Sequence, residues 1–299
     1  MSLGGTSARV TDLFHPGEVL SETYEIRGKI GEGGMGQVYD AYDLRIGRHV
    51  AIKAACPGSA VPVSREARAL GALHQHPGMV AVHALGVHAG VEYAVMDRIL
   101  GATLEQHLER HRSVGSSLPI DEIVAILRGA ADGLAVVHRA GMAHRDVKPA
   151  NLILAPGNRV VLTDFGIFQP ESELTESAIV CGTPRYMAPE AITGSIEPGE
   201  LFLVDVYALG IVAYEMLTGS VPFDHEAAGK LLWMHVSEPV PDVSRRRPDT
   251  PPRLAALVRD MMAKDPQARP LGMDPVVWQL GLVSGERSGP LARAVLPCR

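Results

Sequence analysis

The sequence predicts an α+β protein of two unequal lobes, a small β-rich lobe followed by a larger and mainly helical one. Between Tyr24 and about Met96, short β-like runs alternate with turn residues, and only residues 64–73 have a helical pattern. From about Thr103 onward helical patterns dominate. The expected divisions are an N-terminal segment 1–23, a first lobe 24–98, a second lobe 99–280 and a tail 281–299 of unknown role.

Composition limits the possible function classes. The chain has 299 residues, of which 46% are hydrophobic, so it can bury a large core. Its formal net charge of −6 argues against a nucleic-acid partner, because phosphate backbones require clustered Lys and Arg. The one basic cluster, Arg245–Arg247, is interpreted as a solvated loop rather than a docking patch.

Cysteine usage and hydropathy favour the cytoplasm. The three cysteines, Cys56, Cys181 and Cys298, are odd in number and far apart, which suggests neither a disulfide framework nor a thiolate metal site. The longest apolar run, Val206–Tyr214, is too short to span a bilayer. No membrane segment is therefore expected in this chain, and Met1–Thr11 lacks the order of a signal peptide.

The second lobe is expected to contain five main helices. Asp121 is a favourable charge near the start of the longest one, and Gly141 follows its end. After Pro270, the segment Leu271–Pro275 is expected to interrupt the last helix. The expected helices cover residues 104–110, 120–139, 203–217, 227–235 and 252–262.

The loop His144–Asn151 carries the chemistry. Asp146 can accept a proton from a hydroxyl, Lys148 can neutralise a phosphoryl group, and the amide oxygen of Asn151 can hold Mg²⁺. Phosphoryl transfer requires these three functions. The run resembles the catalytic loop of the eukaryotic-like (Hanks-type) Ser/Thr protein kinases, in which a Lys two residues after the Asp accompanies Ser and Thr acceptors. This resemblance implies the bilobed protein-kinase fold, with ATP and Mg²⁺ as cofactors.

Ile30–Val38 matches the Gly-x-Gly-x-x-Gly-x-Val flap that covers ATP in this family. Glycine is expected at Gly31, Gly33 and Gly36 because a Cβ there would keep backbone N–H groups away from the phosphates. Dinucleotide-binding folds use similar glycines, but a helix should follow in those folds. Residues 38–42 continue as a strand instead, which favours the kinase interpretation.

Lys53 lies in the apolar run Val50–Lys53, where an ammonium group needs an anionic partner. The resemblance supplies two anions, the α/β-phosphates and the Glu of a following helix, for which Glu66 is the candidate. Its separation of thirteen residues from Lys53 is shorter than usual in the family, so either the connection is trimmed or the ion pair forms with a shifted helix. A trimmed connection would hold the helix inward and favour a permanently assembled pair. A surface lysine on an edge strand is the alternative for Lys53.

Asp164-Phe165-Gly166 follows the apolar strand Val160–Leu162, eighteen residues after Asp146. The triplet resembles the metal-binding triplet of the family. The resemblance implies that Asp164 holds Mg²⁺ at the β- and γ-phosphates and that Asn151 makes the second metal contact.

The resemblance also implies the adenine site. The backbone of Asp97 and Ile99 would contact the base, and the side chain of Met96 would lie behind it. The lining residues could equally be ordinary core, and the sequence does not separate the two interpretations. The apolar walls would come from Ile30, Val38, Ala51 and Leu154.

Residues 181–190 resemble the end of a protein-kinase activation segment. By this resemblance Thr183 hydrogen-bonds near Asp146 and Lys148 and shapes the floor for a small hydroxyl substrate. Small-molecule phosphotransferases of related fold usually lack both this segment and the glycine flap.

Two further matches follow in family order. Glu190 would pair with Arg269, and Asp205 would anchor the backbone of the catalytic loop. Helix capping is an alternative explanation for Asp205.

Arg145 directly precedes Asp146, where by resemblance an Arg pairs with a phosphate on the activation loop. Thr175 and Ser177 are the candidate phosphosites, and bacterial members of the family modify such hydroxyls in trans. Transient self-association is therefore an expected interaction. The alternative is that both are exposed loop hydroxyls with no role.

The sequence favours an ATP- and Mg²⁺-dependent protein Ser/Thr kinase that transfers the γ-phosphoryl group to Ser/Thr hydroxyls of protein substrates. Two alternatives stay open, a nucleotide-binding pseudokinase scaffold and a small-molecule kinase. The Gly-Gly-Met-Gly run is typical of bacterial members. The expected catalytic residues are Asp146, Lys148, Lys53 and Glu66.

Overall fold

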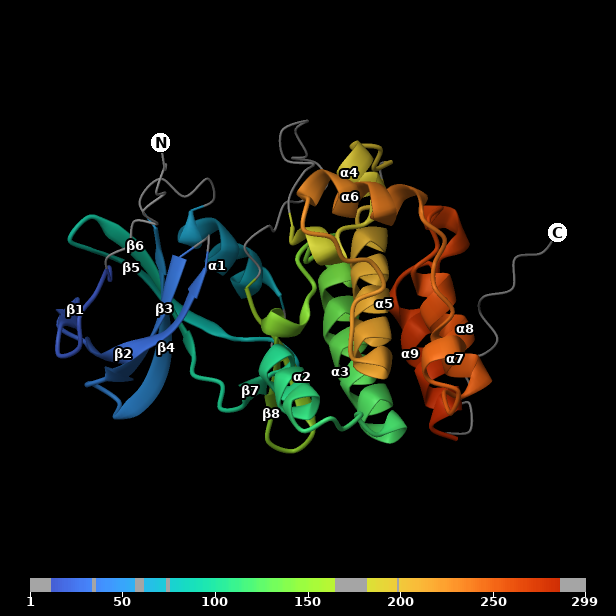
Figure 1. Ribbon diagram of the computed structural model, residues 1–299. Helices are drawn as coiled ribbons and strands as arrows, with labels where there is room; N and C mark the ends of the chain where they lie inside the picture. Colours follow the sequence, from blue (N-terminus) through green and yellow to red (C-terminus); the bar gives the residue numbers. More distant parts are fainter. Residues whose placement is uncertain are drawn as a thin grey trace, which may run out of the picture. The chain divides into compact units, whose positions relative to one another are not determined.

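The structure is a computed structural model that describes residues 12–33, 36–56, 62–73, 76–164, 182–197 and 199–285. Its contacts group these residues into two compact units (Figure 1). The first unit runs up to Gly71 and resumes at Ala81–Arg98. The second comprises Ala72–Val80 and the chain from Ile99 onward.

The first unit is built on a six-stranded antiparallel sheet with the order β1-β2-β3-β4-β6-β5 (Figure 1). Burial alternates along β3, as expected for a strand with one face on a core. The strands are β1 (Val19–Leu20), β2 (Tyr24–Gly33), β3 (Gly36–Asp43), β4 (Arg48–Ala55), β5 (Val82–His88) and β6 (Val91–Asp97).

The core of this sheet includes residues that precede the expected start of the lobe. Phe14 and Leu20 are buried with Tyr39 and Tyr93 in one apolar cluster. The rings of Phe14 and Tyr39 lie 5.5 Å apart, in a tilted aromatic contact. The described part of the segment 1–23 is thus packed into the first unit, although its local pattern alone did not indicate a strand.

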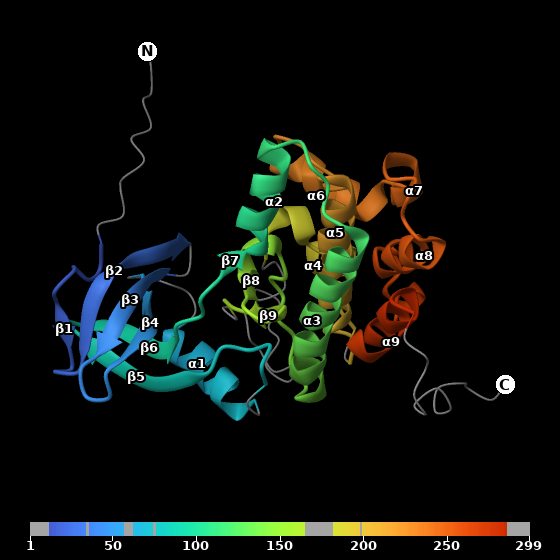
Figure 2. The ribbon, with the colours of Figure 1, turned by 90° about the horizontal axis from the view of Figure 1, so that it is seen from below.

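Helix α1 (Val63–Ala72) packs on the same sheet. Its residues Val63 and Ala67 contact Ala94 of β6, with Val82 and Met96 at the edge of the cluster. Figure 2 shows α1 beside β5 and β6. The helix predicted at residues 64–73 is confirmed, shifted by one residue.

The second unit is mainly helical and contains all five helices expected from the sequence. Helix α2 continues three residues beyond the expected end at Arg110. Within the described ranges, no helix combines the length and apolar composition needed to cross a membrane. The elements are β7 (Ala102–Thr103), α2 (Leu104–Ser113), α3 (Ile120–Arg139), η1 (Pro149–Asn151), β8 (Leu152–Ala155), β9 (Arg159–Leu162), η4 (Pro184–Tyr186), α4 (Pro189–Thr193), α5 (Leu203–Thr218), α6 (Ala228–Ser237), α7 (Val243–Arg246), α8 (Pro252–Met261), η5 (Pro266–Ala268) and α9 (Met273–Val283).

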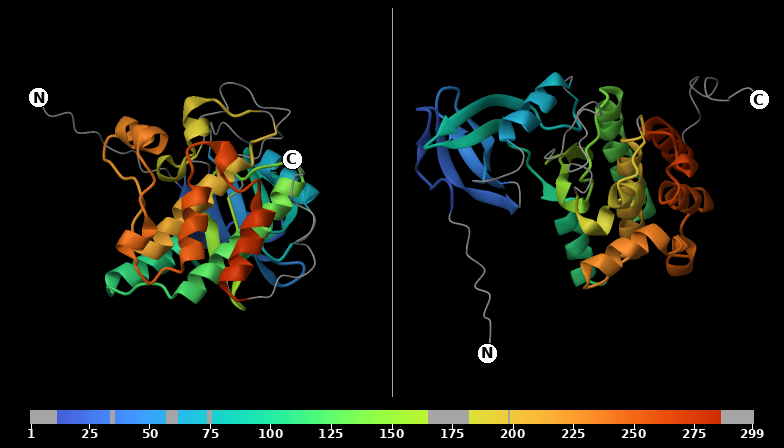
Figure 3. Two further views of the ribbon diagram at one scale, coloured as in Figure 1. Left: turned by 90° about the vertical axis from the view of Figure 1, so that its right-hand side faces the viewer. Right: turned by 90° about the horizontal axis from the view of Figure 1, so that it is seen from above.

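Helix α5 is the centre of this unit, since it is buried from Leu203 to Leu217. It packs against α3 and α8, and Figure 3 shows α8 and α9 beside α5 and α3. Gly210 allows the close approach of α8, because a Cβ at this position would lie 2.9 Å from the Cβ of Met261. A helix that is apolar on all sides is typical of such a central position.

Helix α3 supports the strand that leads to Asp164. A Cβ at Gly133 would lie 2.7 Å from Leu162 Cδ1, and one at Gly129 would lie 2.9 Å from Val160 Cγ2. The two glycines therefore let β9 lie directly on α3. This packing supports the position of Thr163 and Asp164, which directly follow β9.

The expected interruption of the last helix at Leu271–Pro275 is wrong for most of that segment, because α9 begins at Met273. Pro275 is the third residue of the helix, where a backbone N–H has no partner within the helix and its loss costs little. Met273, Val276 and Leu280 are buried, and this apolar side attaches α9 to α3 and α8.

A buried ion pair ties α4 to the segment before α9. The Arg269 guanidinium donates two hydrogen bonds to the Glu190 carboxylate, at 2.6 and 2.8 Å, and another to the Leu203 carbonyl at 2.9 Å. The expected Glu190–Arg269 pair is therefore present. Its side chains are 6% and 0% exposed, so each charge depends on the other for compensation.

We expect Glu190→Ala to lower the free energy of unfolding of the second unit by about 3–5 kcal/mol, because it leaves a buried guanidinium unpaired. Urea unfolding followed by tryptophan fluorescence measures this, since both tryptophans, Trp233 and Trp278, lie in this unit.

The matched control is Asp274→Ala, which removes the partner of Arg139 from a pair that is 59% and 72% exposed. It should cost less than about 1 kcal/mol. Equal losses for the two variants would contradict a structural role of the buried pair.

Candidate active site

The loop that follows α3 is held by one buried carboxylate. Asp205 near the start of α5 is fully buried and accepts hydrogen bonds from the backbone N–H groups of His144 (2.8 Å) and Arg145 (2.7 Å). It also accepts one from His138 Nε2 at 2.9 Å. The anchoring role expected for Asp205 is thereby confirmed, and helix capping does not explain its contacts.

Burial alone would raise the pKa of the Asp205 carboxyl. The hydrogen bond and charge of His138, the charge of His144 and the His144 backbone N–H outweigh this effect and lower the pKa below its usual value. Asp205 is consequently ionised at neutral pH and accepts all three hydrogen bonds.

Arg145 has a left-handed backbone with φ of 65°, which is unfavourable for a residue with a side chain. Such strain costs about 1–3 kcal/mol and persists where the surroundings enforce it. Here the Asp205 carboxylate accepts the Arg145 N–H and supports the strained turn directly before Asp146. The Arg145 side chain is buried, and its pairing with a phosphate stays a prediction.

His144 joins the loop to the strand end that precedes Asp164. Its Nε2 donates to the Thr163 carbonyl at 3.0 Å, and its Nδ1 accepts the Asp146 N–H at 3.3 Å. The Thr163 N–H in turn donates to the Asn151 carbonyl at 3.0 Å. The backbone of Asp164 is therefore held beside the catalytic-loop residues.

Asp146, Lys148 and Thr183 form a compact hydrogen-bonded group. Lys148 Nζ donates to Asp146 Oδ2 at 2.6 Å and to Thr183 Oγ1 at 2.8 Å. The hydroxyl and N–H of Thr183 donate to Asp146 Oδ1 at 2.8 and 3.1 Å. The contacts expected for Thr183 with Asp146 and Lys148 are present, across 37 and 35 residues of sequence.

The electrostatics of this group keep Asp146 ionised. Burial raises the pKa of its carboxyl, but the hydrogen bond and charge of Lys148 and the hydrogen bond of Thr183 outweigh burial, so that the pKa is lowered. An ionised carboxylate accepts hydrogen bonds only, which suits a group that orients a hydroxyl or takes up its proton.

Asn151 is oriented by Asp146. Its Nδ2 donates to the Asp146 carbonyl at 2.8 Å and to Asp146 Oδ2 at 3.1 Å. Two acceptors at one end require the amide nitrogen there, which turns the side-chain oxygen the other way. That oxygen and the Asp164 carboxylate are hard oxygen donors, the ligand type that Mg²⁺ prefers. The donor set thus fits the expected metal.

A pocket lies next to this group, formed within the second unit by the catalytic loop, the segment after Gly182, α4 and α5. Asp146 and Thr183 are among the residues that line it. The lining residues are Arg145, Asp146, Val147, Gly182, Thr183, Tyr186, Met187, Ala188, Ala191, Val204 and Ala208.

The first unit carries the expected phosphate-handling residues. Lys53 on β4 is 4% exposed, which excludes the surface-lysine alternative. Its neighbours across the sheet are Val38 and Ala94. Glu66 belongs to α1, but its carboxylate lies outside the described side chains. The Lys53–Glu66 pair therefore stays a prediction.

Within the glycine flap, packing in the unit itself demands glycine at one position. A Cβ at Gly36 would lie 2.1 Å from the Ala54 carbonyl oxygen, so β3 and β4 could not pair as they do. A Cβ at Gly31 would make an ordinary 3.7 Å contact with Val38. Gly33 lies opposite Gly36 at the end of the β2–β3 ladder.

The residues expected around adenine are divided between the two units. In the first, Met96 lies opposite Ala51 on neighbouring strands, and the Asp97 N–H donates to the Ala81 carbonyl at 2.9 Å. The N–H of Asp97 is thus already engaged within the unit. Ile30 is 45% exposed on β2. In the second unit, Ile99 follows the boundary and Leu154 pairs with Ala102 across β7 and β8.

Several sequence-based expectations fall outside the described residues. These include the candidate phosphosites Thr175 and Ser177, the Phe165 and Gly166 of the metal-binding triplet, and Cys181.

His138 is a site residue that the sequence analysis missed. It continues the buried face of α3 formed by Leu127, Ala131 and Leu134, at spacings of four, three and four residues. A polar residue on an apolar helix face is a signal for a buried partner. The pattern, however, does not reveal that the partner is Asp205.

We expect Asp205→Asn to lower the free energy of unfolding by about 3 kcal/mol at neutral pH, because the amide nitrogen would face buried N–H donors and leave them unpaired. The lowered pKa makes the stabilisation by Asp205 complete above the pKa of the unfolded carboxyl, and it is lost as the pH falls through the folded pKa.

The difference between wild type and Asp205→Asn should therefore shrink on acidification. Urea unfolding across acidic to neutral pH measures it, with Asp249→Asn, from a pair in which the Asp is 68% exposed, as control. A difference that does not change with pH would contradict an ionised Asp205.

Comparison with known proteins agrees with this geometry. The family model described as protein kinase domain matches residues 24–276. The chain is 35% identical to the probable serine/threonine-protein kinase pknA2 of Bifidobacterium longum, over 85% of this chain and 34% of that protein. It is 33% identical to the serine/threonine-protein kinase PknA of Mycobacterium tuberculosis, over 92% and 64% of the two chains. It is 36% identical to the serine/threonine-protein kinase PknB of Mycolicibacterium smegmatis, over 84% of this chain and 41% of that protein.

The chain thus spans between about one third and two thirds of the length of these curated relatives. The match covers both units, the β-rich first lobe and the helical second lobe. The chain therefore belongs to the protein kinase family, as a Hanks-type Ser/Thr kinase domain.

Proposed function

We propose that this protein transfers the γ-phosphoryl group of ATP, with Mg²⁺, to Ser and Thr hydroxyls of protein substrates. The observation that carries the proposal is the group of Asp146, Lys148 and Thr183, in which one ammonium bridges the carboxylate and the threonine hydroxyl. The names of the bacterial relatives support the same activity.

Each member of the group has a distinct task in this proposal. Asp146 is ionised and accepts the hydrogen bond of the substrate hydroxyl, which orients the oxygen for attack. Lys148 neutralises charge that develops on the transferring phosphoryl group. Thr183 holds the carboxylate in place. By family membership it would also shape the floor for a small hydroxyl substrate.

Asn151 and Asp164 would hold Mg²⁺ when it is bound, and the ion would then neutralise the phosphate oxygens. For the first lobe we propose the roles implied by family membership. Lys53, supported by Glu66, would contact the α/β-phosphates, and the flap from Gly31 to Gly36 would cover them.

The base would be held by Asp97, through its carbonyl, and by the backbone of Ile99, with Met96 behind it. The apolar side chains expected around the base keep their proposed roles, namely Ile30, Val38, Ala51 and Leu154. We also propose a cytoplasmic location, because ATP is supplied there.

Two other functions use part of the same site. A pseudokinase scaffold would bind nucleotide without transfer, and the presence of Lys53, Asp146, Asn151 and Asp164 argues against it. A small-molecule kinase would share Asp146 and Asn151, but the ordered contacts of Thr183 favour a protein substrate. Phosphorylation of a metabolite alone would restore that alternative.

We expect Asp146→Asn to lower the rate of phosphoryl transfer by at least a hundredfold, because an amide cannot take up a proton and no longer pairs with Lys148. Incorporation of radiolabel from γ-labelled ATP into the protein itself and into a generic basic substrate measures this.

Asp224→Asn is the matched control, since this Asp belongs to an exposed pair with Arg185. Its activity should stay near that of the wild type. Wild-type protein that labels neither itself nor the basic substrate would contradict the proposed function.

We further propose that Thr175 and Ser177 are phosphorylated in trans and that Arg145 binds the resulting phosphate. The double variant Thr175→Ala, Ser177→Ala should lower activity several-fold, because Arg145 would lose its anionic partner. Treatment of the wild type with a phosphatase should have the same effect. Unchanged kinetics after this treatment would exclude the regulatory role.

A further inference from the structure

A cluster of potential metal ligands lies between α2 and α3, outside the residues assigned to phosphoryl transfer. His107 and His111 are four residues apart on α2 and therefore point from the same side of the helix. Glu122 is in the first turn of α3. Among the described residues, the potential ligand atoms of these three side chains lie within 4.8 Å of one another.

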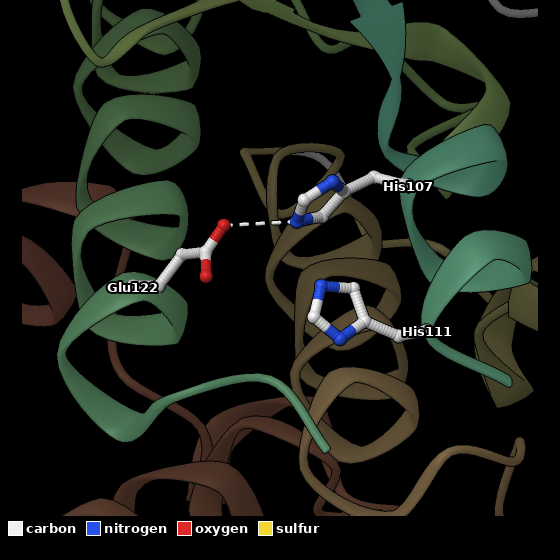
Figure 4. Close-up of side chains that lie close together, drawn as sticks. All are labelled: His107, His111 and Glu122. Atoms are coloured by element: carbon white, nitrogen blue, oxygen red, sulfur yellow. Dashed lines mark hydrogen bonds and ion pairs between the residues drawn. The ribbon is translucent and has the colours of Figure 1, made fainter. Parts of the chain in front are cut away.

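The side chains face a common point. His107 Nε2 is 2.8 Å from Glu122 Oε1, and the centroids of the two imidazole rings are 4.9 Å apart. Figure 4 shows both rings and the carboxylate turned toward one another, with His107 and His111 from one helix and Glu122 from the other.

One ring nitrogen of His111 already has a hydrogen-bond partner. Its Nδ1 is 2.8 Å from the hydroxyl of Ser116, so the ring is held with its other nitrogen toward Glu122 (Figure 4). Ligating histidines usually bind a polar group through the second ring nitrogen, which sets their tautomer and orientation. Ser116 would have this supporting role here.

The connection between the helices is also held in place. The Ser116 N–H donates to the His111 carbonyl at 3.0 Å, and the Gly115 N–H donates to the Arg112 carbonyl at 3.1 Å. Leu118 is 2% exposed and anchors the connection in the core. The three candidate ligands thus come from segments whose positions are restrained before any ion binds, which lowers the entropic cost of binding.

We propose that His107, His111 and Glu122 form a binding site for a divalent transition-metal ion of the zinc type. Two imidazoles and one carboxylate are a ligand set that zinc takes, with a water in the fourth position. The ion would displace the proton that now lies in the hydrogen bond between His107 Nε2 and Glu122 Oε1, and this proton would be released to solvent.

The chemistry of the ligands separates this site from the proposed Mg²⁺ site. Imidazole nitrogens suit Zn²⁺, Cu²⁺ and Ni²⁺, whereas Mg²⁺ prefers oxygen ligands as supplied by Asn151 and Asp164. Zinc–nitrogen bonds are about 2.0–2.1 Å long. Side-chain rotations that move the ligand atoms by roughly an ångström would therefore bring them from their present spacing to bonding distance of one ion. The bound ion would join α2 to the start of α3.

The test is isothermal titration of the EDTA-treated, nucleotide-free protein with ZnCl₂, together with thermal unfolding. Wild type should bind one Zn²⁺ at this site, and its melting temperature should rise by on the order of 5 °C at a hundredfold excess over the dissociation constant. MgCl₂ under the same conditions should produce neither effect.

Four single variants test the two histidine ligands and the supporting contact of Ser116 against a control. His107→Gln and His111→Gln should each weaken Zn²⁺ binding by at least tenfold and remove the thermal shift, and Ser116→Ala should weaken it by about tenfold, as loss of a supporting contact does. His49→Gln is the matched control, because His49 pairs with Asp40 as a single exposed histidine and should bind zinc as wild type does.

Circular dichroism of each variant without metal checks that α2 and α3 are still folded. The proposal is independent of phosphoryl transfer, since Asp146→Asn should bind Zn²⁺ like the wild type. Wild-type protein that does not bind Zn²⁺, or His107→Gln and His111→Gln variants that bind it with unchanged affinity, would overturn the proposal.

Discussion

The buried carboxylate of Asp205 is the interaction on which the catalytic loop depends. It accepts two backbone N–H groups of the loop and one imidazole, and without it the strained turn at Arg145 would lack its hydrogen-bond acceptor. A carboxylate is well suited because it offers several acceptor positions in one rigid plane. Its burial would favour the neutral form, so the loop also depends on the donors that keep it charged. Helix α5, buried along almost its whole length, provides the rigid support for this group.

A second set of contacts turns that anchored loop into a site. Asp146 is shared by Lys148, Thr183 and Asn151, so the position of the carboxylate is set from three directions. The same contacts compensate its charge, which keeps it ionised in spite of burial. The segment that contains Thr183 is itself held at its far end, where Glu190 pairs with Arg269. Electrostatic preorganisation of this kind is the main contribution that a protein makes to phosphoryl transfer.

The two polar clusters of the second unit differ in the ions that they suit. Beside Asp146 the expected metal ligands, on Asn151 and Asp164, are oxygen atoms, and the charges of Asp146 and Lys148 compensate one another. Between α2 and α3 two imidazoles face a half-exposed carboxylate near the surface. Hard oxygen donors and softer nitrogen donors select different cations, so both sites can exist on one chain without competition for the same ion.

The parts whose function depends on local spacing could be predicted from the order of the amino acids. The loop from His144 to Asn151, the glycine flap, the buried Lys53 and the main helices follow from neighbouring residues and from the period of the apolar pattern. Which distant residues meet could be recognised only in the folded chain. His138 contacts Asp205 across 67 residues, Phe14 packs on Tyr39, and helix α3 places Glu122 opposite two histidines of α2. Helix α9 likewise depends on packing against α3, because its first turn tolerates the proline and its buried residues attach it there. The physical reason is that local propensity fixes each element, whereas contacts between elements depend on how their buried faces fit together.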